Sequence, residues 1–168
     1  MLILGLDPGS LHTGFGVIDC VGGSVRAIVA GRWSAPAGEC LGERLNFLAT
    51  SLEELLRRAR PDLAVVEKPF HGVNARSALV LAEARGALLL TLARAGLRVE
   101  EYSPAEVKSS VTGSGRADKA QVARMVRLLL GLSGSALAAD ATDALAIALC
   151  SSQRQSLRRL TDQASARK

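Results

Sequence analysis

The chain opens with a short apolar run that ends in a single carboxylate, and this run restricts the possible folds most. Leu2–Leu6 holds four large apolar residues and a glycine, Asp7 follows, and Pro8-Gly9-Ser10 has the composition of a turn. Such a short run, bounded by turn residues, is typical of a β-strand buried on both faces. A carboxylate at the end of a buried strand is costly unless a positive group meets it. Taken alone, Asp7 is equally well explained as a cap of the turn.

A second strand with the same ending follows one helix later. Leucines recur at helical spacing over residues 41–60, and the apolar run 62–67 then finishes at Glu67. A strand, a helix and a strand of this kind form a parallel crossover, which brings both carboxyl ends to one edge of the sheet. We therefore expect Asp7 and Glu67 to lie close together. The alternative for Glu67 is a strand end that simply reaches solvent.

The other segments complete an α/β pattern. Residues 13–20 and 25–33 are predicted strands joined by a glycine turn, so the chain begins with an antiparallel meander. We further expect helices over 75–96 and 136–152, a strand over 97–102, and two short helices capped by Ser103 and Asp118. The predicted fold is a five-stranded mixed sheet, three antiparallel strands followed by parallel strands, flanked by helices.

The second predicted helix is apolar almost all round between residues 78 and 93. A helix of this kind is buried on two sides. One side can be the sheet. The other side is covered either by a second copy of the chain or by another helix of the same domain.

Two aspartates stand three residues apart on the last predicted helix. Asp140 and Asp143 share one helical face, and alanine, leucine and isoleucine surround them. Like charges on a helix built for burial repel each other and need a cation. The alternative is a pair of solvated aspartates. If this helix lies across the sheet edge, both converge with Asp7 and Glu67.

Four carboxylates without a histidine pair indicate a particular metal chemistry. Oxygen ligands alone suit Mg²⁺ or Mn²⁺ rather than zinc. Two such ions roughly 3.5–4 Å apart activate a water and stabilise the leaving oxygen of a phosphoryl displacement. A metal-dependent nuclease is the simplest interpretation, and a net charge of +5 is consistent with a nucleic acid partner.

Length and composition set the remaining limits. The 168 residues, 48% of them hydrophobic, suit one domain, which we place at residues 1–152, followed by a basic, flexible tail at 153–168. No apolar run reaches the ~18 residues of a membrane span, and no secretory signal is evident. The three cysteines are widely spaced, which fits the reducing cytoplasm.

Two loops carry candidate DNA contacts. Phe70 lies in a polar, turn-rich setting and is either a stacking platform for a base or an anchor packed on the core. Residues 112–119 hold two glycines and basic side chains, and they either clamp a phosphate backbone or form a solvated linker. We add Arg76 and Arg116 as candidate DNA contacts.

Five motifs, taken in order, resemble the RuvC family of bacterial Holliday-junction resolvases. The motifs are LGLDPGS with TGFGVI, VVExxF, AEVK, GSGRADKxQV and DATDALAIA, and they extend from residue 2 to about residue 150. The resemblance implies a ribonuclease H-like fold and a homodimer with two active sites. It implies symmetric, metal-dependent nicks in a four-way DNA junction during recombination and repair, which leave 5′-phosphate and 3′-hydroxyl ends. It also implies the RuvA–RuvB branch-migration complex as a partner.

The resemblance also assigns roles to individual residues. The catalytic and metal-binding acids fall on Asp7, Glu67, Asp140 and Asp143, the stacking aromatic on Phe70, and the DNA-contacting lysines on Lys108 and Lys119. The expected cofactor is Mg²⁺, two ions per active site, with Mn²⁺ as the alternative.

Three other functions remain open on the sequence alone. A ribonuclease H-like nuclease of ribosomal RNA maturation also opens with a strand and a D-P-G turn. A sugar-kinase or actin-like nucleotide binder shares the Asp-Pro-Gly-Ser and Thr-Gly hairpin but needs two such domains. A non-catalytic junction-binding protein would lose affinity for DNA through four acids at its binding face.

Overall fold

The structure is a computed structural model that describes the backbone of residues 1–69, 75–132 and 137–165, and the side chains of these segments as far as residue 156. In chain order the elements are β1 (Leu2–Asp7), β2 (His12–Val21), β3 (Ser24–Ser34), α1 (Leu41–Ala59), β4 (Leu63–Glu67), α2 (Ala75–Arg94), β5 (Val99–Tyr102), α3 (Pro104–Thr112), α4 (Lys119–Leu129) and α5 (Ala139–Ser165). The strands form one sheet in the order β3-β2-β1-β4-β5. β1, β2 and β3 are antiparallel, whereas β1, β4 and β5 are parallel, which confirms the predicted mixed sheet.

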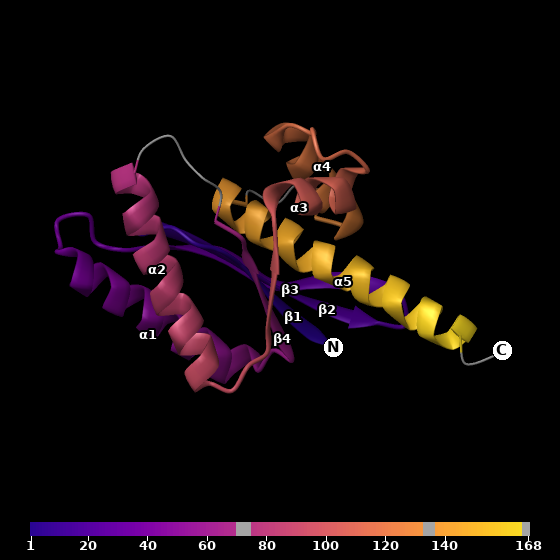
Figure 1. Cartoon of the computed structure of the whole chain (residues 1–168), viewed down its shortest axis with the longest axis horizontal. Coiled ribbons are helices and arrows are strands. Elements are labelled where there is room, and N and C mark those ends of the chain that lie inside the picture. Colours follow the sequence, from indigo (N-terminus) through magenta and orange to yellow (C-terminus); the bar gives the residue numbers. More distant parts are fainter. Residues whose placement is uncertain (70–74, 133–136, 166–168) are drawn as a thin grey trace.

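Helices cover both faces of this sheet. α1 and α2 lie on one side and α3, α4 and α5 on the other (Figure 1). Side chains alternate along a strand, so Leu4 and Leu6 join the core beneath α1 and α2, whereas Ile3 joins the core beneath α5. By the same alternation Asp7 and Glu67, at the ends of β1 and β4, both belong to the face that α5 covers.

Glycines allow α5 to lie directly on the sheet. A Cβ at Gly5 would stand 2.0 Å from the carbonyl oxygen of Ala144, and one at Gly14 would stand 2.0 Å from that of Asp140. Neither position has room for a side chain, so the backbone of α5 rests on β1 and β2. This close approach brings the first turns of α5 to the edge where Asp7 ends β1.

The turn after β1 is closed by a threonine at the start of β2. Thr13 is fully buried, and its hydroxyl donates a hydrogen bond to the Gly9 carbonyl at 2.7 Å and accepts one from the Gly9 amide at 3.2 Å. These two bonds hold the Pro8-Gly9-Ser10 turn against β2. The position of Asp7 is therefore fixed from both sides, by the sheet before it and by the closed turn after it.

The last helix is longer than predicted. We expected it to end at residue 152, but α5 continues to Ser165, so that prediction is wrong. Arg154 anchors the start of this continuation to α3 and β5, since it pairs with Glu106 of α3 at 2.9 Å and its guanidinium lies 4.8 Å from the centre of the Tyr102 ring of β5. The division into a domain at 1–152 and a flexible tail at 153–168 stays a prediction.

The apolar helix α2 is packed on one side within the chain. Ala84, Leu88 and Leu92 are buried in the core that also holds α1 residues, whereas Leu79 and Leu90 are 66% and 60% exposed. The described residues therefore supply only one of the two covers that we expected. Neither α2 nor another helix in the described segments is long and apolar enough to cross a membrane.

Candidate active site

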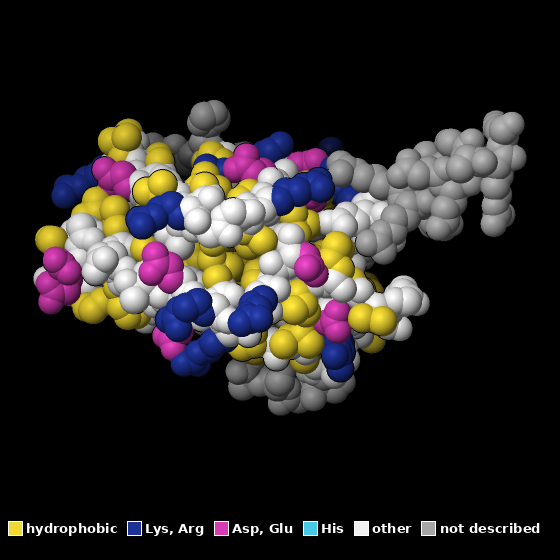
Figure 2. Space-filling model, turned by 90° about the horizontal axis from the view of Figure 1, so that it is seen from below, with side chains coloured by type: hydrophobic (Ala, Val, Ile, Leu, Met, Phe, Trp, Pro, Cys, Tyr) yellow, Lys and Arg dark blue, Asp and Glu magenta, His cyan; other side chains and the backbone are white. Residues whose placement is uncertain are grey.

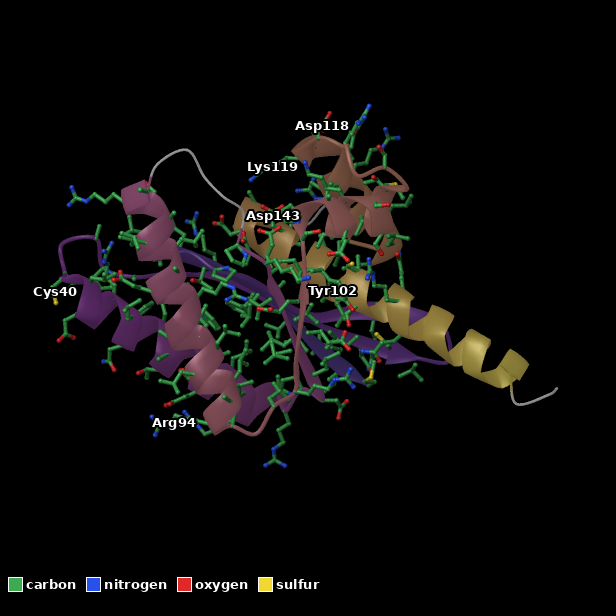
Figure 3. The ribbon with its side chains drawn as sticks, in the orientation of Figure 1. Cys40, Arg94, Tyr102, Asp118, Lys119 and Asp143 are labelled. Atoms are coloured by element: carbon green, nitrogen blue, oxygen red, sulfur yellow. The ribbon has the colours of Figure 1, made fainter. Side chains whose placement is uncertain are left out.

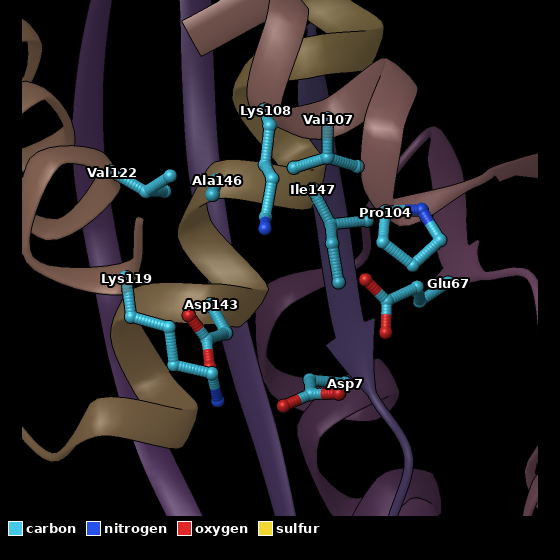
Figure 4. A pocket seen from close by; sticks show the side chains of 10 residues that line it. All are labelled: Asp7, Glu67, Pro104, Val107, Lys108, Lys119, Val122, Asp143, Ala146 and Ile147. Atoms are coloured by element: carbon cyan, nitrogen blue, oxygen red, sulfur yellow. The ribbon is translucent and has the colours of Figure 1, made fainter. Parts of the chain in front are cut away.

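Three of the four predicted acids line one cleft of about 250 Å³. Asp7 ends β1, Glu67 ends the parallel strand beside it, and Asp143 comes from the start of α5. Figure 4 shows their carboxylates turned toward a common opening, which Lys108 and Lys119 also face. The sequence predicted this convergence from strand ends and helix spacing.

Helix caps place the two lysines at the cleft. Ser103 and Glu106 form a capping box at the start of α3, in which the Ser103 amide donates to the Glu106 carboxylate at 2.8 Å. Asp118 caps α4 in the same way, which makes Lys119 the first residue of that helix. Both predicted caps are confirmed. Because the caps fix where α3 and α4 begin, they also fix which residues of each helix reach the cleft.

The cleft concentrates negative charge in a buried setting. Burial, and then the charges of Glu67, Asp143 and Asp140, raise the pKa of Asp7 from its ordinary value of 3.8 to about 7, and Lys119 opposes this shift. Burial and the Asp143 charge likewise raise the pKa of Glu67. The acids therefore lack sufficient positive charge around them, which a bound cation would supply.

The fourth acid stands apart from the other three. Asp140 lies three residues before Asp143 on α5 and is not among the residues that line the cleft. Its carboxylate Oδ2 lies 3.4 Å from Nη1 of Arg32, a residue of β3 that the sequence did not single out. Asp143 instead pairs with Lys119 at 3.6 Å, and Figure 3 shows these two residues next to each other between α4 and α5.

The donor set fits a hard divalent cation by its chemistry. It consists only of carboxylates, the ligands that such a cation prefers. Burial and neighbouring negative charges raise the pKa of two of them, Asp7 and Glu67, because both effects disfavour ionisation. As the side chains stand, no three of the described His, Cys, Asp and Glu residues are gathered closely enough to hold a metal ion. The carboxylates would have to close around an ion from three elements.

The remaining predicted contacts are not gathered at the cleft. Arg76 is exposed in the first turn of α2, and Arg116 is exposed in the connection between α3 and α4. Phe70 lies outside the described residues. The apolar wall of the cleft was not anticipated by the sequence reasoning, and it consists of Pro104, Val107, Val122, Ala146 and Ile147.

Comparison with known proteins shows the family of this chain. Residues 3–151 match the family model of the crossover junction endodeoxyribonuclease RuvC. The RuvC of Chloroflexus aurantiacus is 47% identical over 150 residues, which are 89% of this chain and 92% of that protein. The Thermus thermophilus RuvC structure superposes with a TM-score of 0.86 at 33% identity, over 94% of this chain and 96% of that one.

A second solved structure includes a substrate. The structure of T. thermophilus RuvC in complex with a Holliday junction substrate matches with a TM-score of 0.84 at 35% identity, over 89% of this chain and 92% of that chain. The family match extends through every motif that the sequence offered, and it decides against the RNA-maturation and nucleotide-binding alternatives. The chain belongs to the RuvC family of crossover junction endodeoxyribonucleases.

Proposed function

We propose that this crossover junction endodeoxyribonuclease hydrolyses opposed strands of a four-way DNA junction with the help of two Mg²⁺ ions, for which Mn²⁺ can substitute. The observation that carries the proposal is the convergence of three acids from separate elements in one cleft, two of them with raised pKa values. When bound, the ions supply an activated water and neutralise charge on the phosphate. Asp7, Glu67 and Asp143 would hold them, and Asp140 would complete the set.

The basic residues of the cleft have a separate role in this proposal. Lys108 and Lys119 face the same opening as the acids, so they would contact the phosphates on either side of the scissile bond. The exposed Arg76 and Arg116 would contact the backbone farther away, and Phe70 would stack on a base at the branch point. Attack of the water oxygen on phosphorus would break the bond from phosphorus to the 3′ oxygen, which takes a proton, so that a 5′-phosphate and a 3′-hydroxyl remain.

The active species would be a homodimer with two such sites. The open face of α2 supports this proposal, because Leu79 and Leu90 are exposed on a helix whose opposite face is buried. The face seen in Figure 2 carries basic, acidic and apolar side chains intermixed, so it is not a uniformly basic surface.

We further propose the RuvA–RuvB complex as a partner and the cytoplasm as the compartment, where the free cysteines would remain reduced.

The test is cleavage of a synthetic four-way junction beside a linear duplex, with and without Mg²⁺. We expect paired nicks in the junction that require the metal. Glu67→Gln should slow cleavage at least about a hundredfold, because the loss of a metal ligand removes several kcal/mol of transition-state stabilisation. Glu53→Gln is the matched control, because Glu53 is an exposed residue of α1 away from the cleft.

Two results would count against this function. Cleavage of the duplex as fast as the junction would show that the chain does not recognise the branch. Metal-independent cleavage, or equal cleavage rates for Glu67→Gln and wild type, would show that the carboxylates do not act in the reaction by holding metal ions.

A further inference from the structure

One row of the sheet carries Asp7, Gly14 and Arg32 side by side. Asp7 pairs with Gly14 across β1 and β2, and Gly14 pairs with Arg32 across β2 and β3. Directly opposed residues of antiparallel strands project to the same face. Asp7 and Arg32 therefore both face α5, with a glycine between them.

Asp140 stands above the middle of this row. A Cβ at Gly14 would lie 2.0 Å from the carbonyl oxygen of Asp140 and 3.1 Å from its Cβ, so the first turn of α5 rests on that glycine. The Asp140 carboxylate thus has the acid of β1 on one side and the guanidinium of β3 on the other. It turns to the guanidinium, with Oδ2 3.4 Å from Nη1 of Arg32.

We propose that Arg32 is a positioning residue that holds Asp140 away from Asp7 and competes with a divalent cation for its carboxylate. The proposal rests on the metal site proposed above. Arg32 would make the two ion positions unequal. Asp7, Glu67 and Asp143 already share the cleft, and the Lys119 side chain that pairs with Asp143 is 87% exposed, whereas Asp140 joins them only after leaving Arg32.

The ion pair between Arg32 and Asp140 is weak enough for a divalent cation to displace it. The Arg32 and Asp140 side chains are 42% and 32% exposed, so water screens their attraction. Arginine stays charged at every accessible pH, so the pair does not dissolve by deprotonation of Arg32. A divalent cation carries twice the charge and can displace the guanidinium, at a cost in its own affinity.

The experiment is calorimetric titration of Mn²⁺ into the metal-free full chain, without DNA. Arg32→Met should bind Mn²⁺ at the weaker site about threefold more tightly than wild type, the change expected from losing a partly exposed ion pair. Arg26→Met is the matched control, because Arg26 lies on the same strand, is 74% exposed and pairs with Asp19 at 3.2 Å. The control removes the same charge and should leave the weaker site nearly unchanged.

A double variant shows whether the effect passes through Asp140. In an Asp140→Asn background, Arg32→Met should give no gain in Mn²⁺ affinity. A gain that persists there, an equal gain in Arg26→Met, or unchanged or weaker binding in Arg32→Met would each overturn the proposal. If Arg32→Met does not fold, Arg32→Gln takes its place with the same expectation. Absence of saturable Mn²⁺ binding in wild type would instead overturn the metal site itself.

Discussion

At the scale of single residues, the site brings together negative charges whose burial and mutual repulsion destabilise the folded protein. Asp7 lies at the end of a buried strand, next to acids from two other elements. Burial and like charge both disfavour its ionised form. Without a cation, the arrangement should therefore reduce stability at the pH where the acids must ionise to bind one.

The first prediction concerns the stability of the metal-free protein as pH changes. The pKa of Asp7 rises from 3.8 to about 7 on folding, so the folded state keeps this proton to higher pH than the unfolded chain. The stability from this group is fully present below pH 3.8 and is lost as pH rises through 7. Asp7→Asn never ionises, so at pH 8 with chelator it should be more stable than wild type, by on the order of 2–4 kcal/mol.

Urea unfolding at several pH values measures this difference, which should shrink toward zero near pH 4. Asp118→Asn is a suitable control, because asparagine caps a helix as well as aspartate and Asp118 is exposed at the start of α4. Saturating Mg²⁺ should make wild type more stable than Asp7→Asn, since only wild type keeps the full ligand set. An increase in the stability of wild type relative to Asp7→Asn as the pH rises would contradict the raised pKa of Asp7.

At the scale of elements, the sequence predicted what local patterns encode. Both strand-end acids were placed at one edge from a strand, helix and strand pattern, and the caps at Ser103 and Asp118 were correct because capping is a local interaction. The end of α5 at Ser165 was not predicted, since apolar residues become sparse after 152, where Leu157, Leu160 and Ala164 alone interrupt a polar run. Arg32 was missed because its position opposite Gly14 depends on strand register, which is set by pairing between distant residues.

The second prediction tests the packing of α5 on the sheet. Gly14→Ala would force a Cβ to 2.0 Å from the Asp140 carbonyl oxygen, so the first turn of α5 must move. We expect a loss of about 1–3 kcal/mol in unfolding free energy, typical of overpacking, together with slower junction cleavage. Gly42→Ala, in the first turn of α1, is the same change where a Cβ meets only Cys40 Sγ at 4.0 Å, and it should be neutral or slightly stabilising. Equal effects of the two substitutions would show that the close approach at Gly14 is not required.

At the scale of the whole molecule, the cleft and the open face of α2 belong to different parts of the surface. The acids lie at the carboxyl ends of β1 and β4, whereas Leu79 and Leu90 project from α2 on the other side of the sheet. A second chain could cover α2 and leave both clefts accessible. Two sites held in one assembly are what paired nicks in opposed strands of a junction require.

The last prediction follows from this arrangement. The double variant Leu79→Glu with Leu90→Glu places charges on the face that a second chain would bury, and unpaired charge in an apolar interface costs several kcal/mol. The dissociation constant of the dimer should therefore rise at least about a hundredfold, measured by sedimentation equilibrium. Leu128→Glu is the control, because Leu128 is 71% exposed on α4 and lies away from α2. The α2 variant should still bind Mn²⁺, since no metal ligand changes, but should nick junction strands singly. A wild type that sediments as a monomer, or an α2 variant that stays dimeric, would show that another surface joins the two sites.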